Sequence, residues 1–133
     1  GVRDPRSPKA SDVVAALGER ARAAGIGEAV YGADAVILAV PYSAAQEALT
    51  AAADLAGTVL IDATNPLNDD GSALTIGHDT SAAEEIARQV PGARIVKAFN
   101  TTGAVNMADP IYDGRPLPMP YTGDDDAAKQ VAA

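Results

Sequence analysis

Cysteine and tryptophan are absent from this sequence, and histidine and phenylalanine occur once each. Without cysteine, disulfides, thiolate nucleophiles and cysteine-based zinc sites are excluded, and a reducing compartment is compatible with the composition. Because Phe99 is one of very few aromatic residues in a chain that is 47% apolar, the core has to be aliphatic. The single His78 has no histidine, cysteine or serine partner in its pattern, which favours a surface or capping role over catalysis.

Long hydrophobic runs are also missing. No apolar stretch approaches the roughly 20 residues needed to span a bilayer, and no signal-peptide pattern opens the chain. We therefore expect a soluble, cytoplasmic protein without a membrane partner. The length predicts a single domain covering residues 1–133. Residue 1 is glycine rather than methionine, which is compatible with an absent natural N-terminus.

Positive charge is scarce except at the start of the chain. The net charge is −8, but the first ten residues, GVRDPRSPKA, contain three basic groups and one acid, so the rest carries −10. An acidic body is a poor partner for nucleic acid or an anionic membrane. The basic residues Arg3, Arg6 and Lys9 therefore either serve one small anion or are solvated charges on a turn.

Short apolar runs alternate with helical patterns along the chain. Runs rich in β-branched residues predict buried strands at 35–40, 59–63 and 94–98, with a proline-rich edge strand at 117–122. Apolar residues at helical spacing predict helices at 11–24, 43–53, 81–90 and 124–133.

Helix ends are predicted from their capping residues. Ser11 is the expected N-cap of the first helix, and Gly25 its stop. Ser43 with Gln46, and Ser81 with Glu84, match the capping-box pattern. The acidic run 124–126 fits a helix N-terminus better than a metal site, so we expect no bound metal.

Alternating strands and helices indicate right-handed βαβ units and an α/β fold with a parallel sheet covered on both faces. In such sheets, ligands bind at the carboxyl ends of the strands. The loops at residues 3–9, 40–43, 64–67 and 99–103 are therefore the candidate binding loops.

The residues of these blocks resemble a known family. The segments VRDP, AVILAVPYSAAQEAL, IDATNPL, TSAAEEIARQVPGARIVKAFNTTGA and YTGDDDAAKQVA are similar to successive blocks of the NADP-dependent reductases of coenzyme F420, a deazaflavin. The resemblance covers nearly the whole chain. The spacing of NPL and VKAFNT after two successive strands is its most specific part.

The resemblance implies a Rossmann-like, doubly wound parallel sheet that binds NADP. In this fold an arginine at the end of the second strand accommodates the 2′-phosphate, which gives Arg3 and Lys9 that role, with Arg6 as a third candidate. Family members carry a first strand and a glycine-rich turn ahead of VRDP. We therefore expect a chain truncated at both ends, lacking the first strand and that turn. Gly25 and Gly27 do not replace it, because they follow a helix and precede a strand.

The resemblance also implies contacts for the other strand ends. Ala39, Val40 and Pro41 would face the ribose on the nicotinamide side; alternatively, Pro41 only ends a strand. Asn65 and Pro66 would lie near the nicotinamide, although Asn-Pro is also a common turn pair. Asn100 and Thr101 would border the space between the nicotinamide and deazaflavin rings.

Hydride transfer between NADP(H) and coenzyme F420, or a similar small-molecule acceptor, is carried by the two cofactors, so no catalytic side chain is required.

The resemblance further implies a homodimer of the full-length protein through its C-terminal helices. Two alternatives stay open: a non-catalytic NADP-binding module, and an inactive truncated product of such a reductase.

Overall fold

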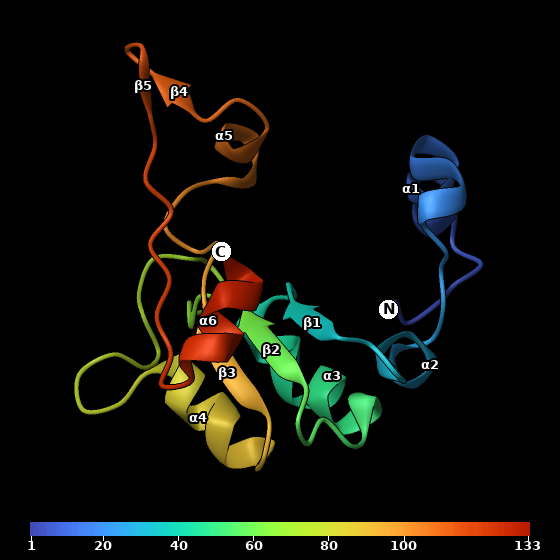
Figure 1. The fold of residues 1–133 in the computed structure, drawn as a ribbon, viewed down its shortest axis with the longest axis horizontal. Coiled ribbons are helices and arrows are strands. Elements are labelled where there is room, and N and C mark those ends of the chain that lie inside the picture. The colour runs from blue at the N-terminus through green and yellow to red at the C-terminus, as the bar shows by residue number, and fades with distance from the viewer.

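A three-stranded parallel sheet forms the centre of the protein, whose computed structural model describes residues 1–133 (Figure 1). Its strands are β1 (Ala35–Leu38), β2 (Val59–Asp62) and β3 (Arg94–Lys97), in that spatial order. The first residues of the three strands lie opposite one another: Ala35 pairs with Val59, and Val59 pairs with Arg94. The α/β class, with a Rossmann-like parallel sheet, is thereby confirmed.

Helices cover the sheet on both faces. One core cluster joins Leu60 of β2 to residues of α3 and α4, and a second joins Val59 and Ile61 to Ala128 of α6. Because successive side chains of a strand point to opposite faces, α3 and α4 cover one face and α6 covers the other. The helices are α1 (Pro8–Leu17), α2 (Ile26–Val30), α3 (Ala45–Ala52), α4 (Ala82–Gln89), α5 (Ala104–Ala108) and α6 (Asp126–Ala132).

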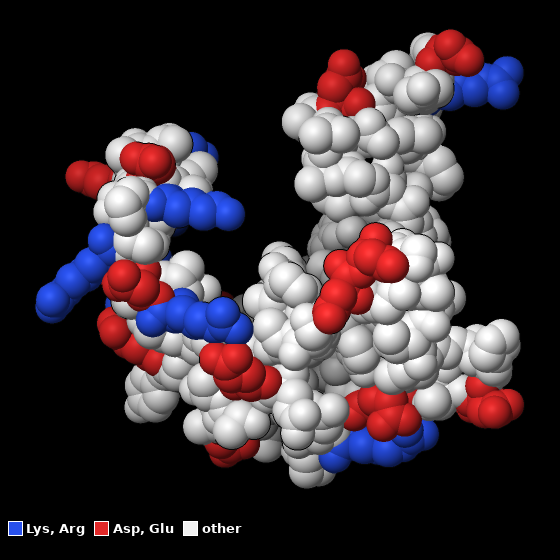
Figure 2. All heavy atoms as spheres, turned by 180° about the vertical axis from the view of Figure 1, so that it is seen from behind, with Lys and Arg blue, Asp and Glu red and all other residues white.

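Two segments project from this body. The first is the N-terminal segment with α1, which is tied to the following loop by a 3.0 Å hydrogen bond from the Val2 N–H to the Ala24 carbonyl. The second is an arm of α5 and the hairpin β4 (Ile111–Tyr112) and β5 (Arg115–Pro116). The two projections stand on opposite sides of the sheet (Figure 1), and a wide hollow separates them (Figure 2).

The hairpin of the arm was not predicted, although its turn has a clear signal. Asp113 and Gly114 both have positive φ, at 49° and 73°, as a two-residue hairpin turn requires. The Asp-Gly pair in IYDGRP is one of the favoured sequences for that turn.

The predicted first helix was wrong at both ends. Helix α1 begins earlier because Ser7 caps it, accepting a hydrogen bond from the Ala10 N–H, and Pro8 occupies the first turn. Ser11 lies inside the helix and donates to the Ser7 carbonyl. The helix ends at Gly18, whose φ of 60° suits glycine.

The two predicted capping boxes have opposite outcomes. The Ser81–Glu84 box is confirmed at the start of α4, with both reciprocal hydrogen bonds present. The Ser43–Gln46 box was wrong, because a 3₁₀ turn at Tyr42–Ala44 precedes α3 and its cap, Ala44, makes no side-chain bond.

The other predicted elements agree with the observed ones to within a few residues, whereas α2 and α5 were not predicted. The observed strands end one or two residues before their predicted ends, and the expected edge strand at 117–122 is reduced to one antiparallel bridge between Thr122 and Lys97. The C-terminal helix is confirmed, and Asp125 caps it by accepting a bond from the Ala128 N–H. None of the helices combines the length and apolar character that crossing a membrane requires.

Candidate functional site

The carboxyl ends of the three strands bring three of the four predicted loops to one edge of the sheet, whereas the loop at residues 3–9 follows no strand. Backbone pairing continues one residue past the strands: the Ala63 N–H donates to Leu38 O, and the Ala98 N–H donates to Asp62 O, both at 3.1 Å. The segments that follow are Ala39–Val40–Pro41, Thr64–Asn65–Pro66 and Phe99–Asn100–Thr101. The edge is therefore lined by amide, hydroxyl and small apolar groups.

Two asparagine side chains join the second and third loops. The Asn65 Nδ2 donates to the Asn100 backbone carbonyl at 3.2 Å, and the Asn100 Nδ2 donates to the Asn65 Oδ1 at 3.1 Å. Asn65 is exposed and Asn100 half-buried, and each primary amide has hydrogen-bonding capacity left over. This pair presents donors and acceptors to a ligand at the edge.

The third loop leaves its strand through an unusual backbone conformation. Phe99 has a φ of 63°, in the left-handed region that residues other than glycine rarely occupy. Such conformations cluster at ligand sites, where the surrounding structure holds them in place. The bend directs Asn100 to Asn65, while the Thr101 hydroxyl lies 3.6 Å from the Met119 sulfur.

A buried ion pair lies directly beneath the asparagine pair, and it was not predicted. Asp62 is fully buried, and its Oδ2 accepts a 2.9 Å bond from the Lys97 Nζ. Its Oδ1 accepts bonds from the Thr64 N–H at 2.9 Å and the Thr64 hydroxyl at 2.7 Å. The sequence signal was available, since VLIDA and RIVKA place opposite charges at matching positions of neighbouring strands.

Tyr42 lies in the 3₁₀ turn after β1 and packs against the core. Burial of the phenol raises the pKa of Tyr42, and the negative charges of Glu85 and then Asp62 raise it further. The phenol therefore stays protonated across the physiological range. Tyr42 therefore covers part of the core beside this turn.

The two predicted phosphate ligands lie in different surroundings. The Arg3 guanidinium makes a 2.9 Å ion pair with Glu47 in the first turn of α3, so Arg3 lies beside the turn that follows β1. Lys9 is exposed in the first turn of α1 and lines a cavity of about 310 Å³ together with Gly1, Val2 and Ser7. Glu47 pairs with Arg3 but not with Lys9, so no shared carboxylate brings the two cations together.

Surface charge separates the N-terminal projection from the body. Half of the ten basic side chains lie within residues 1–22. Figure 2 shows Lys and Arg mixed with acids on this projection, whereas the body presents mainly Asp and Glu on the same face. An anionic ligand would therefore meet less repulsion near residues 1–22.

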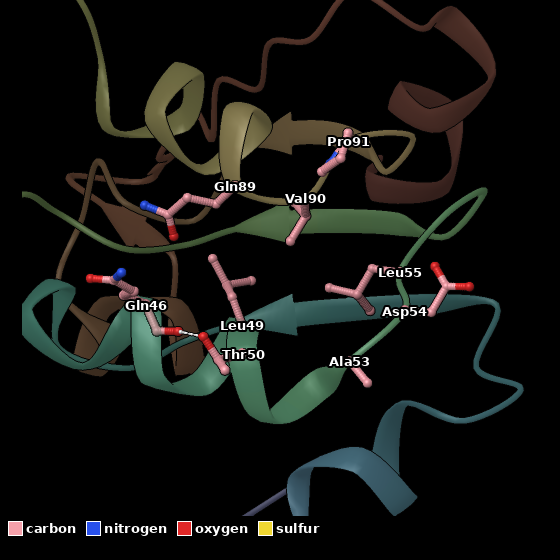
Figure 3. A pocket seen from close by; sticks show the side chains of 9 residues that line it. All are labelled: Gln46, Leu49, Thr50, Ala53, Asp54, Leu55, Gln89, Val90 and Pro91. Carbon is pink, nitrogen blue, oxygen red and sulfur yellow. Dashed lines mark hydrogen bonds between the residues drawn. The ribbon is translucent and has the colours of Figure 1, made fainter.

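A larger cavity lies away from this edge. It has a volume of about 420 Å³ and runs between α3 and α4, lined by Gln46, Thr50 and Gln89 among others (Figure 3). Its wall includes Ala53–Leu55 and Val90–Pro91, which precede β2 and β3 and so belong to the opposite end of the sheet. None of the predicted ligand residues lines it.

The sequence also raised His78, the acidic run 124–126 and the glycines Gly25 and Gly27 as candidates for a functional role. His78 is exposed and lies three residues before the cap Ser81. Asp126 forms a 2.8 Å ion pair with Lys129 within α6. Gly25 and Gly27 lie at the start of the five-residue α2, which begins before β1 rather than after it.

Comparison with known proteins finds a family that resembles the first half of the chain. Residues 2–66 match the family described as NADP oxidoreductase, coenzyme F420-dependent. No curated protein matches the chain.

Two solved structures are similar over almost the entire chain. One is a candidate F420-dependent NADP reductase from Arthrobacter sp. FB24, at 33% identity and a TM-score of 0.87, covering 99% of this chain and 64% of that protein. The other is a hypothetical protein from Sinorhizobium meliloti, at 32% identity and a TM-score of 0.81, covering 98% and 63%. The chain thus spans just under two thirds of the length of these relatives. The protein is thus similar to the coenzyme F420-dependent NADP oxidoreductases, by sequence over residues 2–66 and by fold over nearly the whole chain.

Proposed function

We propose that the chain is the nucleotide-binding part of an NADP-dependent oxidoreductase, which transfers a hydride between NADP(H) and coenzyme F420 or a similar acceptor. The observation that carries this proposal is the asparagine pair at the strand ends, in a chain similar to this family. Primary amides that donate and accept at one edge suit the carboxamide of a nicotinamide. The bound cofactors supply the hydride chemistry.

The chain's own residues bind and orient the cofactor. Asn65 and Asn100 hold the nicotinamide end, with Pro66 and Thr101 flanking them. Ala39, Val40 and Pro41 leave a smooth, uncharged wall against the ribose, since they carry no polar side-chain atom. Arg3 binds the 2′-phosphate by charge-assisted hydrogen bonds.

Lys9 contributes to phosphate binding only if α1 approaches Arg3. The long-range hydrogen bonds of residues 1–24 are few, and the exposed Arg3–Glu47 pair is of a kind that contributes about 0–1 kcal/mol. Movement of the N-terminal segment toward an anion therefore costs little free energy.

Calorimetric titration with NADPH and NADH tests the cofactor preference. In the double variant Arg3→Ala/Lys9→Ala, NADPH affinity should fall about tenfold or more, because a hydrogen bond to a charged group contributes about 1.5–3 kcal/mol. NADH affinity should stay unchanged. The matched control, Arg20→Ala/Arg115→Ala, removes two exposed charges elsewhere and should spare both ligands.

Equal loss of NADPH and NADH in the double variant would contradict the phosphate assignment. A second measurement addresses the reaction: reduction of coenzyme F420 by NADPH, followed spectroscopically. Binding of NADPH without turnover of any acceptor would instead favour the non-catalytic binding module.

A further inference from the structure

The ion pair of Asp62 and Lys97 satisfies every oxygen of a buried carboxylate. Asp62 has no exposed surface, and the Lys97 side chain is 18% exposed. Removing a carboxylate from water is costly unless it is both paired and hydrogen-bonded. Here Oδ2 accepts from Lys97, and Oδ1 accepts two bonds from Thr64. The carboxylate is therefore held in one orientation.

The bonds of this pair are directed at the turn beyond the strands. Asp62 holds the N–H and the hydroxyl of Thr64, while the Lys97 ammonium also donates to the Thr64 backbone carbonyl. That carbonyl belongs to the peptide group joining Thr64 to Asn65. Both ends of Thr64 are thus fixed, and the orientation of the peptide that begins Asn65 is set by Lys97.

The third loop is fixed at the same point. Lys97 is the last residue of β3, and its N–H and carbonyl pair with Thr122 at 2.8 and 3.0 Å. Asn100 follows three residues later and bonds to Asn65. The lysine therefore links both loops that carry the asparagine pair.

Stability alone does not explain charges at this position. Apolar residues of similar volume in place of a buried ion pair are often neutral or stabilising. What the ion pair adds is direction, because its bonds have a defined geometry and three of them hold Thr64: two from Thr64 to Asp62, and one from Lys97 to the Thr64 carbonyl.

We propose that Lys97 is a positioning residue: anchored on the buried Asp62, it holds the Thr64 carbonyl and so sets Asn65 against Asn100 for the nicotinamide carboxamide. This inference rests on the proposed function. Lys97 does not need to touch the cofactor, because it acts through the turn.

The test separates the two ends of the cofactor. NADPH and adenosine 2′,5′-bisphosphate, which lacks the nicotinamide half, are titrated into the wild type and Lys97→Met. NADPH affinity should fall about tenfold, whereas adenosine 2′,5′-bisphosphate affinity should stay within about twofold. Lys129→Met is the matched control, since Lys129 is also a partly exposed lysine in an ion pair, and it should change neither.

Nuclear magnetic resonance of the side-chain amides gives a readout without ligand. In Lys97→Met the Asn65 and Asn100 amide signals should shift and exchange faster with solvent, while signals of the Ser81–Glu84 cap stay in place. If Lys97→Met does not fold because Asp62 is left unpaired, Asp62→Asn/Lys97→Met removes both charges and carries the same expectations.

Unchanged NADPH affinity or unchanged asparagine signals in a folded variant would overturn the proposal. Equal loss of both ligands would also overturn it, since that outcome indicates general destabilisation. If the wild type binds neither ligand, the proposed function fails, and the amide signals alone decide whether Lys97 positions Asn65.

Discussion

Strands β1 and β2 are neighbours of equal length, yet their environments differ sharply. All four residues of β2 are buried, including the charged Asp62, because the strand is paired on both sides. Strand β1 is paired on one side only, and its Ile37 is 58% exposed. The more polar run, VLID, is thus buried more deeply than the fully apolar AVIL. Position in the sheet, rather than hydrophobicity of the run, decides burial here.

The largest expected loss of stability comes from truncating a buried side chain of the central strand, β2. Leu60→Ala should lower the free energy of unfolding by about 2–5 kcal/mol, because it leaves a cavity among fully buried neighbours. Ile37→Ala in β1 should cost less than about 1 kcal/mol, since most of that side chain already contacts solvent. Urea unfolding monitored by circular dichroism measures both. Similar losses in the two variants would mean that β1 is paired or covered in solution.

The next effect compares two glycines, one in each half of the molecule. A Cβ on Gly123 would lie 2.5 Å from the Ile95 carbonyl oxygen, so Gly123→Ala should cost about 1–3 kcal/mol by overpacking against β3. A Cβ on Gly25 would meet nothing within 4 Å, and Gly25→Ala should cost less than about 1 kcal/mol. Thermal denaturation ranks the two, and the reverse order would contradict the close packing of residue 123 on β3.

A smaller effect distinguishes the two predicted capping boxes. Ser81→Ala should cost about 1 kcal/mol, because the hydroxyl accepts a bond from the Glu84 N–H. Ser43→Ala should change stability by less than about 0.5 kcal/mol, since that residue caps nothing. Equal costs at the two serines in urea unfolding would show that Ser43 does cap α3.

The smallest effect is a pH dependence at the same cap. The backbone N–H of Ser81, and then its hydroxyl, lower the pKa of Glu84 below its ordinary value. A depressed folded-state pKa contributes stability above the unfolded value that is lost as the pH falls through the folded value. Glu84→Gln should therefore be less stable than the wild type near about pH 7, and the difference should shrink as the pH falls through the folded-state pKa of Glu84. A difference that persists at low pH would assign the effect to packing instead.

The sheet and its covering helices were predictable because periodicity and caps are local signals. The runs at 59–63 and 94–98 and the Ser81–Glu84 box lie within two residues of the observed elements. The first helix was misplaced because two serines, Ser7 and Ser11, each offered a cap. The combination of Ser7 with Pro8 and Gly18 decides between them only when the three are considered together.

The candidate site was predictable as a set of strand ends, but its contacts were not. Chain order places Asn65 and Asn100 after neighbouring strands, and the structure adds the hydrogen bonds between them. The left-handed backbone of Phe99 has no sequence signal, because only tertiary packing holds a phenylalanine there. Separation of Arg3 and Lys9 likewise depends on where α1 lies.

The ion pair between Arg3 and Glu47 makes anion binding at this position an exchange. A phosphate that reaches Arg3 competes with a carboxylate already in place, so the guanidinium has an anionic partner both with and without the ligand. Because both side chains are largely exposed, the pair contributes only about 0–1 kcal/mol, and replacing the carboxylate with an incoming anion costs little. The carboxylate also sets a threshold: a doubly charged phosphate competes with one carboxylate, whereas a neutral hydroxyl does not.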